Sequence, residues 1–353
     1  MGIGSFIGTL IAAEIVARLL LPALPVDTHT WPRAEIGQKL EQIEAIEQRG
    51  QGTDVLFAGS SLTAAGVNPQ AFTRATGLSS YNAAFAGPSM RTVARWVLDI
   101  VEPKLSPDVV VVGVASRDVN DNAAKNLGMF ENFIRSPGYK QETASFASRV
   151  EGWLEDASTF MRYRRLFREP ATLLDQSSEK LKQQRIRKEI GARGLRLDDP
   201  RNYFFSAKMA SRLHDNVLAE FSVGGGEARA LQEMSRELQA RGVEMILLNM
   251  PVTSDYVASH VDPEADVAQF HALLTEFARK SEVILVNAED AFADSTPFRD
   301  LMHLDVEGRD ALTDALASGW SRLDDGTQLE VSCSSEEVPE CSMEPLDHLG
   351  LTR

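Results

Sequence analysis

Cysteine is scarce in this chain: only Cys333 and Cys341 occur among its 353 residues. Seven residues separate them and there is no third cysteine, so a cysteine-based zinc site is excluded, while a small disulfide loop remains open. Histidine is also sparse, with six residues in all. No three-ligand metal spacing and no lysine-bearing, glycine-rich phosphate loop occurs. We therefore expect neither a metal nor a cofactor.

Basic residues are outnumbered, with 36 Lys and Arg against 51 Asp and Glu, which gives a formal net charge of −15 and a pI near 4.9. Such a surface repels the phosphate backbone of nucleic acids, which excludes them as partners. It also repels anionic lipid headgroups.

Charged residues are almost missing from the N-terminus. Residues 2–25 are apolar apart from Glu14 and Arg18, and a bilayer-spanning helix needs roughly 20 apolar residues. The two charges are four apart and can pair on one helix face, which lowers the cost of burying them. We expect a transmembrane anchor in residues 1–25, in contact with lipid through residues 3–24. A cleaved signal peptide and an amphipathic or core helix remain as alternatives.

The rest of the chain alternates apolar runs with helical spacing. After a linker and helix over 26–50, strand-like runs begin at TDVLFAG and recur four times, at residues 78–87, 106–116, 242–251 and 281–290. Helical patterns lie between them, over 90–102, 226–241 and 266–280. This order predicts an α/β domain over 51–325, with five mostly parallel strands covered by helices on both faces. Residues 121–225 are predicted to form a helical insertion, and 326–353 a poorly ordered acidic tail.

Two short segments have side chains suited to acyl-transfer chemistry. Gly59-Ser60-Ser61 follows the first apolar run, where a serine is either a helix cap or a nucleophile. Near the C-terminus, Asp300 and His303 are three residues apart, so the carboxylate can orient an imidazole that takes a proton from a serine. The other five histidines have no such context.

Four segments together resemble the motif blocks of the SGNH, or GDSL, hydrolases. GSSL at 59–62 is similar to their first block, YNAAFAG at 81–87 to the second, VVVVGVASRD at 109–118 to the strand leading to the third, and DLMHLDVEG at 300–308 to the last. The resemblance covers roughly residues 54–324. It implies a three-layer, flavodoxin-like fold with a central five-stranded parallel sheet. Three segments resemble the membrane-anchored branch: the N-terminal segment with its Glu14–Arg18 pair, GSSLTAAGVNP at 59–69 and NMPVTSDY at 249–256. That branch includes proteins that act in polysaccharide O-acetylation and teichoic acid D-alanylation.

The resemblance also implies roles for single residues. Ser61 aligns with the nucleophile and donates one backbone N–H to the oxyanion, and Gly87 aligns with the second donor. Ser60 stands where the family has the aspartate of GDSL. Asp300 and His303 align with the orienting acid and the base.

One part of the family pattern is missing. The third block, G-x-N-D, is here Ala115-Ser116-Arg117-Asp118, so the asparagine that donates to the oxyanion is absent. Ser116, Arg117 and Asn120 are the residues that could take its place or bind substrate.

We therefore expect an extracytoplasmic, single-pass membrane serine esterase or O-acyltransferase that acts on acyl esters of a cell-surface glycan or polymer, with membrane-protein partners. The alternative is a non-catalytic SGNH-like scaffold of a membrane assembly for polymer modification or export. A hydrogen-bonded chain from Ser61 through His303 to Asp300 would favour the enzyme.

Overall fold

The computed structural model describes residues 14–16, 18–19, 31–144, 190–197, 206–292, 297–323, 328–334 and 339–345. The chain forms two compact units, one of Met1–Gly37 with Phe133–Lys188 and one of Gln38–Asn132 with Glu189–Arg353. The predicted division into an anchor, a linker helix, a domain over 51–325 and a tail stays a prediction.

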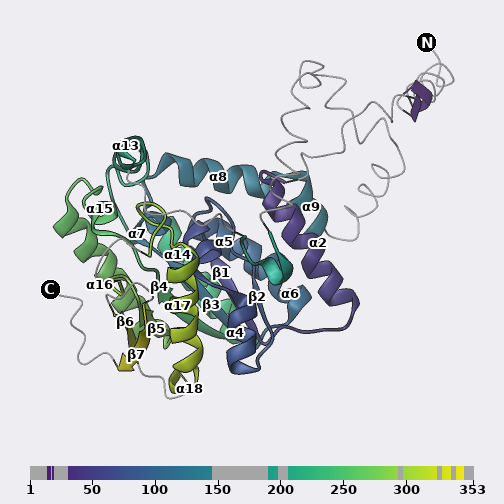
Figure 1. The fold of residues 1–353 in the computed structure, drawn as a ribbon. Helices are drawn as coiled ribbons and strands as arrows, with labels where there is room; N and C mark the ends of the chain where they lie inside the picture. The colour runs from purple at the N-terminus through teal and green to yellow at the C-terminus, as the bar shows by residue number, and fades with distance from the viewer. Residues whose placement is uncertain are drawn as a thin grey trace, which may run out of the picture. The chain divides into compact units, whose positions relative to one another are not determined.

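A seven-stranded sheet lies at the centre of the second unit, in the order β2-β1-β3-β4-β5-β6-β7 (Figure 1). Each neighbouring pair is parallel except β6 and β7. The first five strands follow the doubly wound order 2-1-3-4-5, which places the ligand crevice at their carboxyl ends. The strands are β1 (Val55–Gly59), β2 (Ser80–Asn82), β3 (Val109–Val114), β4 (Glu244–Asn249), β5 (Ile284–Asn287), β6 (Leu329–Cys333) and β7 (Cys341–Pro345).

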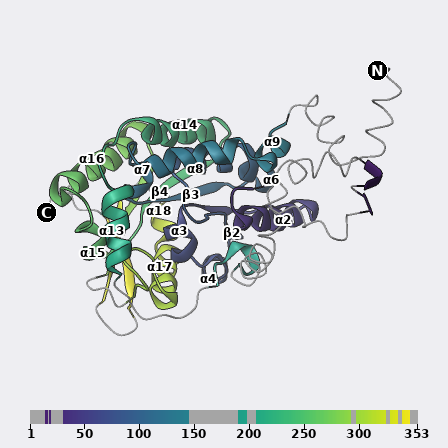
Figure 2. The same ribbon diagram turned by 90° about the horizontal axis from the view of Figure 1, so that it is seen from above.

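Helices cover both faces of this sheet, as Figure 2 shows from above. One layer contains α5 (Met90–Trp96), α14 (Gly226–Ala240) and α16 (Pro263–Ser281); the other contains α3 (Ser61–Gly66), α4 (Pro69–Thr76) and α17 (Val306–Ser318). With both faces covered, β1 has no exposed residue and β3 begins with four valines, as a central parallel strand requires. The prediction of a mostly parallel α/β sheet is confirmed.

The remaining helices connect these elements or extend them. They are α2 (Ala34–Gln48), α6 (Glu102–Leu105), α7 (Ser116–Val119), α8 (Ala124–Ile134), α9 (Pro137–Glu142), α13 (Ala207–Asn216), α15 (Ser254–Val257) and α18 (Trp320–Leu323). A π-helical turn at Val97–Val101 joins α5 to α6, and a 3-10 turn lies at Ala192–Gly194. In the described parts of the predicted insertion at 121–225, α8, α9 and α13 are helical as expected; residues 145–189 and 198–205 lie outside the described ranges.

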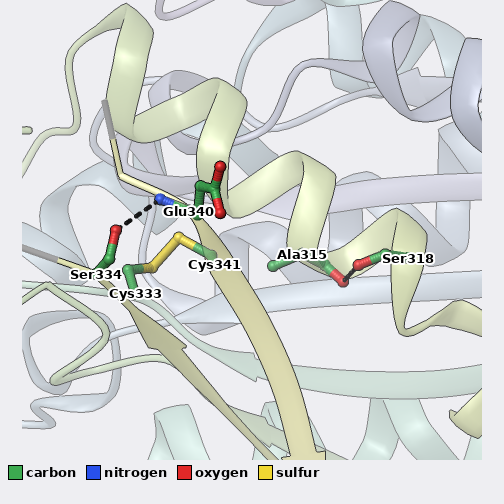
Figure 3. The surroundings of a disulfide bond; sticks show 6 residues. All are labelled: Ala315, Ser318, Cys333, Ser334, Glu340 and Cys341. Atoms are coloured by element: carbon green, nitrogen blue, oxygen red, sulfur yellow. Dashed lines mark hydrogen bonds between the residues drawn. A yellow bond between two sulfur atoms is a disulfide. The ribbon is translucent and has the colours of Figure 1, made fainter. Parts of the chain in front are cut away.

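The acidic tail adds two strands to the sheet, so the prediction of five strands and a poorly ordered tail is wrong for residues 329–333 and 341–345. Leu329 and Val331 alternate with polar residues and are buried, as is Met343 on the partner strand. A disulfide joins Cys333 to Cys341 across the hairpin, beside α17 (Figure 3). Next to it, Glu340 N donates to Ser334 Oγ at 3.0 Å.

The first unit holds an aromatic cluster and the start of the chain. Phe133 lies with its ring centroid 5.7 Å from Trp31 and 5.1 Å from Tyr139. Arg18 and Glu14 form the predicted pair, with Nε 2.7 Å from Oε1. Within the described ranges, no helix is long and apolar enough to cross a bilayer. Most of the span predicted at residues 3–24 lies outside those ranges.

Candidate active site

The turn after β1 places Ser61 at the carboxyl edge of the sheet. Gly59 ends the strand with φ of +146°, and a Cβ there would lie 2.3 Å from Thr63 Oγ1 and 2.6 Å from Gly113 O, so only glycine fits. Ser60 precedes α3, yet its hydroxyl forms no capping bond. The capping interpretation therefore fails for Ser60, and the side chain of Ser61 is directed elsewhere.

Asp300 and His303 lie on a tight turn just before α17. Arg299 N donates to His303 O at 3.0 Å and closes the turn. Asp300 Oδ1 accepts the backbone N–H groups of Met302 and His303 at 3.1 and 3.0 Å. The carboxylate is thus fixed before it contacts the imidazole.

The structure brings the three predicted residues together in one hydrogen-bonded chain. His303 Nδ1 lies 2.8 and 2.9 Å from the two carboxylate oxygens of Asp300. His303 Nε2 lies 2.8 Å from Ser61 Oγ. Since an ionised carboxylate only accepts, the imidazole proton is on Nδ1, and Nε2 is free to accept the proton of Ser61.

The charges of the hydrogen-bonded residues Asp300 and His303 suit proton transfer at neutral pH. Burial would raise the pKa of Asp300, but the hydrogen bond and charge of His303 outweigh it and lower that pKa to about 2. Burial lowers the pKa of His303 below 6.5, although Asp300 opposes this; the charges of Arg299 and Arg196 lower it further. At pH 7 the site therefore pairs a carboxylate with a neutral imidazole, the form that serves as a general base.

The family resemblance assigns the oxyanion to the backbone N–H groups of Ser61 and Gly87. Gly87, in the loop between β2 and α5, has φ of +84°. The loop is held beside the end of β1, where Phe85 N donates to Gly59 O at 3.4 Å. Within the part of the chain that the structure describes, the N–H groups of Ser61 and Gly87 form no hydrogen bond, which is the state that an oxyanion hole requires.

The three residues considered in place of the missing asparagine lie in different surroundings. Asn120 donates to Val217 O at 2.8 Å and accepts from Ser222 N at 3.1 Å, so it fastens the chain near α13 and does not contact the triad. Ser116 Oγ is bonded to the side chains of Tyr256 and His260 and is buried. Arg117 is the one that approaches the triad: its Nη1 lies 3.5 Å from Met302 Sδ.

No protein-family model matches this chain, and no curated protein matches it either. Among solved structures, it is similar to a crystal structure of a candidate acylhydrolase from Bacteroides fragilis, with 13% identity, a TM-score of 0.41, and coverage of 82% of this chain and 97% of the other. This likeness assigns no function to the chain, so its function is inferred from the geometry of Ser61, His303 and Asp300.

A buried contact beside Ser61 could not be predicted from the motifs. Ser60 Oγ donates to Asp118 Oδ2 at 3.0 Å, and Ala115 N donates to the same oxygen at 3.2 Å. A carboxyl group is thus supplied to Ser60, which replaces the aspartate of the first motif, by Asp118 in α7. The sequence signal was Asp118 itself, in the segment that resembles the third block.

A second Ser–His–Asp chain was also missed. Tyr256 OH lies 2.8 Å from Ser116 Oγ, which lies 2.9 Å from His260 Nε2; His260 Nδ1 is 3.4 Å from Asp266 Oδ2. Burial lowers the pKa of His260 and raises that of Tyr256, so both are neutral at pH 7. Because Tyr256 OH also accepts from Arg117 N at 3.1 Å, these hydrogen-bonded side chains fix the turn that holds Arg117.

In the described ranges, no group of three His, Cys, Asp or Glu is placed to bind a metal.

Proposed function

We propose that this protein is a serine ester hydrolase or O-acyltransferase of the SGNH type, anchored in a membrane with its main domain outside the cytoplasm. The observation that carries the proposal is the chain Ser61 Oγ–His303 Nε2 and His303 Nδ1–Asp300, with both links at 2.8 Å. A serine so placed has a neutral base in contact and a carboxylate that stabilises the imidazolium.

The reaction proceeds through an acyl-enzyme. Ser61 Oγ attacks the ester carbonyl while its proton moves to His303 Nε2. The tetrahedral oxyanion collapses, the carbon–oxygen bond to the alcohol breaks, and His303 returns the proton to the departing alkoxide. Water or an acceptor hydroxyl then attacks the acyl-enzyme, with His303 again taking and returning one proton.

The oxyanion is held by the backbone N–H groups of Ser61 and Gly87. Each such donor contributes about 3–4 kcal/mol of transition-state stabilisation in serine hydrolases. Asn120 is engaged away from the triad, so the third donor of the family pattern is either absent or supplied by Arg117.

The proposed substrates are acyl esters of a cell-surface glycan or polymer. The disulfide between Cys333 and Cys341 supports an oxidising compartment. Ile15 and Leu19, exposed beside the Glu14–Arg18 pair, support a lipid-facing segment. Both the membrane anchor and the extracytoplasmic location stay proposals.

Labelling with a fluorophosphonate probe tests the enzyme. The fragment from Pro32 onward is compared with Ser61→Ala, His303→Ala, Ser60→Ala and Ser116→Ala, each checked for folding by circular dichroism. We expect labelling to vanish in the first two variants and to persist in the last two, because Ser60 and Ser116 face other partners. Labelling of Ser116 would show that the wrong serine had been assigned.

A non-catalytic scaffold is the second candidate, favoured by the engagement of Ser116 and Asn120 away from the triad. It predicts a folded fragment that no fluorophosphonate labels and that hydrolyses no ester. That outcome would direct the search towards membrane-protein partners.

A further inference from the structure

The guanidinium of Arg117 is buried with few partners. The residue is 6% exposed, and its side chain forms one hydrogen bond in the described part of the chain, to the thioether of Met302. Its Nε lies 3.4 Å from Asp118 Oδ1, but neither atom has a hydrogen-bond partner among the described residues. A guanidinium carries five N–H donors, and buried donors are normally satisfied. Nε is such an unfilled buried donor, and it points to a ligand that accepts hydrogen bonds.

The place of Arg117 links it to the reacting groups. Met302 directly precedes His303, and Asp118 is hydrogen-bonded to Ser60, which directly precedes Ser61. The Arg117 side chain therefore contacts Met302, next to the proposed base His303. It also contacts Asp118, which is hydrogen-bonded to the residue before Ser61.

Two more arginines act on the same histidine. Arg299 Nε lies 4.0 Å from Asp300 Oδ2, and the charges of Arg299 and Arg196 both lower the pKa of His303. Against these two positive charges, Asp300 is the carboxylate that acts on His303. Both positive charges thus act on His303 in a chain with a formal net charge of −15, and a positive charge favours an anionic ligand beside it.

We propose that the site selects esters that carry an anionic oxygen close to the scissile carbonyl, with Arg117 as its contact and Arg196 and Arg299 as flanking charges. This inference rests on the proposed function and names its substrate class. A carboxylate or a phosphate fits, because a guanidinium binds either through two parallel hydrogen bonds. The charge can sit on the acyl group or on the alcohol.

Paired esters distinguish these sources. p-Nitrophenyl hemisuccinate is compared with neutral p-nitrophenyl butyrate to test a charge on the acyl group. 4-Acetoxybenzoate is compared with its neutral methyl ester to test a charge on the alcohol. In each pair the measured quantity is the ratio of kcat/KM for the anionic ester to kcat/KM for the neutral one.

We expect the ratio to exceed one for at least one pair and to fall about tenfold or more in Arg117→Gln, which is the effect of losing one hydrogen bond to a charged group. Arg117→Lys should recover part of the ratio. Because Arg117 is buried and its variants can misfold, Arg196→Gln and Arg299→Gln provide a second test, in which the ratio also falls. The matched control is Arg236→Gln on α14, where a side chain 75% exposed loses the same charge; its ratio should stay as in the wild type. Added salt should lower the wild-type ratio.

Three results would overturn the inference. A wild-type ratio at or below one in both pairs, with fluorophosphonate labelling intact, would refute it and leave the proposed function standing. Parallel loss of both esters in the Arg117 variants, at constant ratio, would make Arg117 an oxyanion donor or a structural residue. Absence of both hydrolysis and labelling in the folded protein would refute the proposed function and this inference with it.

Discussion

Replacing Asp118 with asparagine should remove a loss of stability that the wild type undergoes as the pH rises, although the change also removes a carboxylate next to the turn that carries Ser61. Asp118 is buried, and burial raises its pKa from 3.8 to about 6. The charge of Arg117 and the hydrogen bonds from Ser60 and Ala115 lower the pKa without offsetting this. The folded protein therefore holds this group at neutral pH in its less favoured, ionised form.

The sign follows from proton linkage. A carboxyl with a higher pKa in the folded chain binds its proton more tightly there than in the unfolded chain. Its contribution to stability is fully present below pH 3.8 and is lost as the pH rises through about 6. The difference in pKa corresponds to about 3 kcal/mol in the free energy of unfolding at pH 8. Asparagine does not ionise, so the variant avoids this loss.

Urea denaturation of the wild type and Asp118→Asn at pH 4 and pH 8 measures the effect. Placing an amide opposite Arg117 changes the free energy of unfolding by the same amount at both pH values. The difference between the two pH values therefore reports only the ionisation of Asp118. We expect the stability of the variant relative to the wild type to rise by about 2–3 kcal/mol from pH 4 to pH 8. Asp314→Asn, at an exposed position, controls for the loss of one negative charge. If the relative stability of Asp118→Asn is unchanged or falls at pH 8, the argument from desolvation is refuted.

Three further changes have defined outcomes. Asp300→Asn should lower kcat by about 10³–10⁴-fold in an esterase assay with the fold intact, because an amide does not hold His303 in the required tautomer; a loss under tenfold would contradict this. Since burial lowers the pKa of His303 from 6.5, kcat/KM should decline on acidification with a midpoint below pH 6.5, and a midpoint above 6.5 in the pH–rate profile would oppose this reasoning. The double variant Cys333→Ser, Cys341→Ser should lower the free energy of unfolding by about 2–3 kcal/mol, because the unfolded chain regains the conformational entropy that closing this short loop removes. Urea denaturation curves that overlay those of the wild type would argue against this.

The sheet could be predicted where single segments determine the structure. The four valines of β3 indicate a strand buried on both faces without reference to any other part of the chain. The hairpin of β6 and β7 could not, because its strands are short, half-exposed and set in an acidic segment. The pairing of β6 with β5 depends on contacts distant in sequence, which local patterns do not encode.

The site divides in the same way. The sequence motifs predicted the three residues that the structure joins by hydrogen bonds, Ser61, His303 and Asp300. Each of them lies in a segment whose residue spacing is recognisable. The bond between Ser60 and Asp118 links residues 58 positions apart and exists only because β1 and β3 are neighbours. His260 stands in no motif, and its bond to Ser116 joins positions 144 apart.

The unfavourable groups of this edge argue for chemistry over a passive scaffold. Thr63 Oγ1, Arg117 Nε and Asp118 Oδ1 are buried without a hydrogen-bond partner among the described residues. All three lie at the ends of β1 and β3, and Asp118 is bonded to the neighbour of Ser61. Buried groups that lack partners cost stability, and folded proteins tolerate them mainly at functional sites. A passive scaffold gives no reason for a buried Arg117 Nε without a partner, whereas the proposed binding of an anionic ester would supply an acceptor for it.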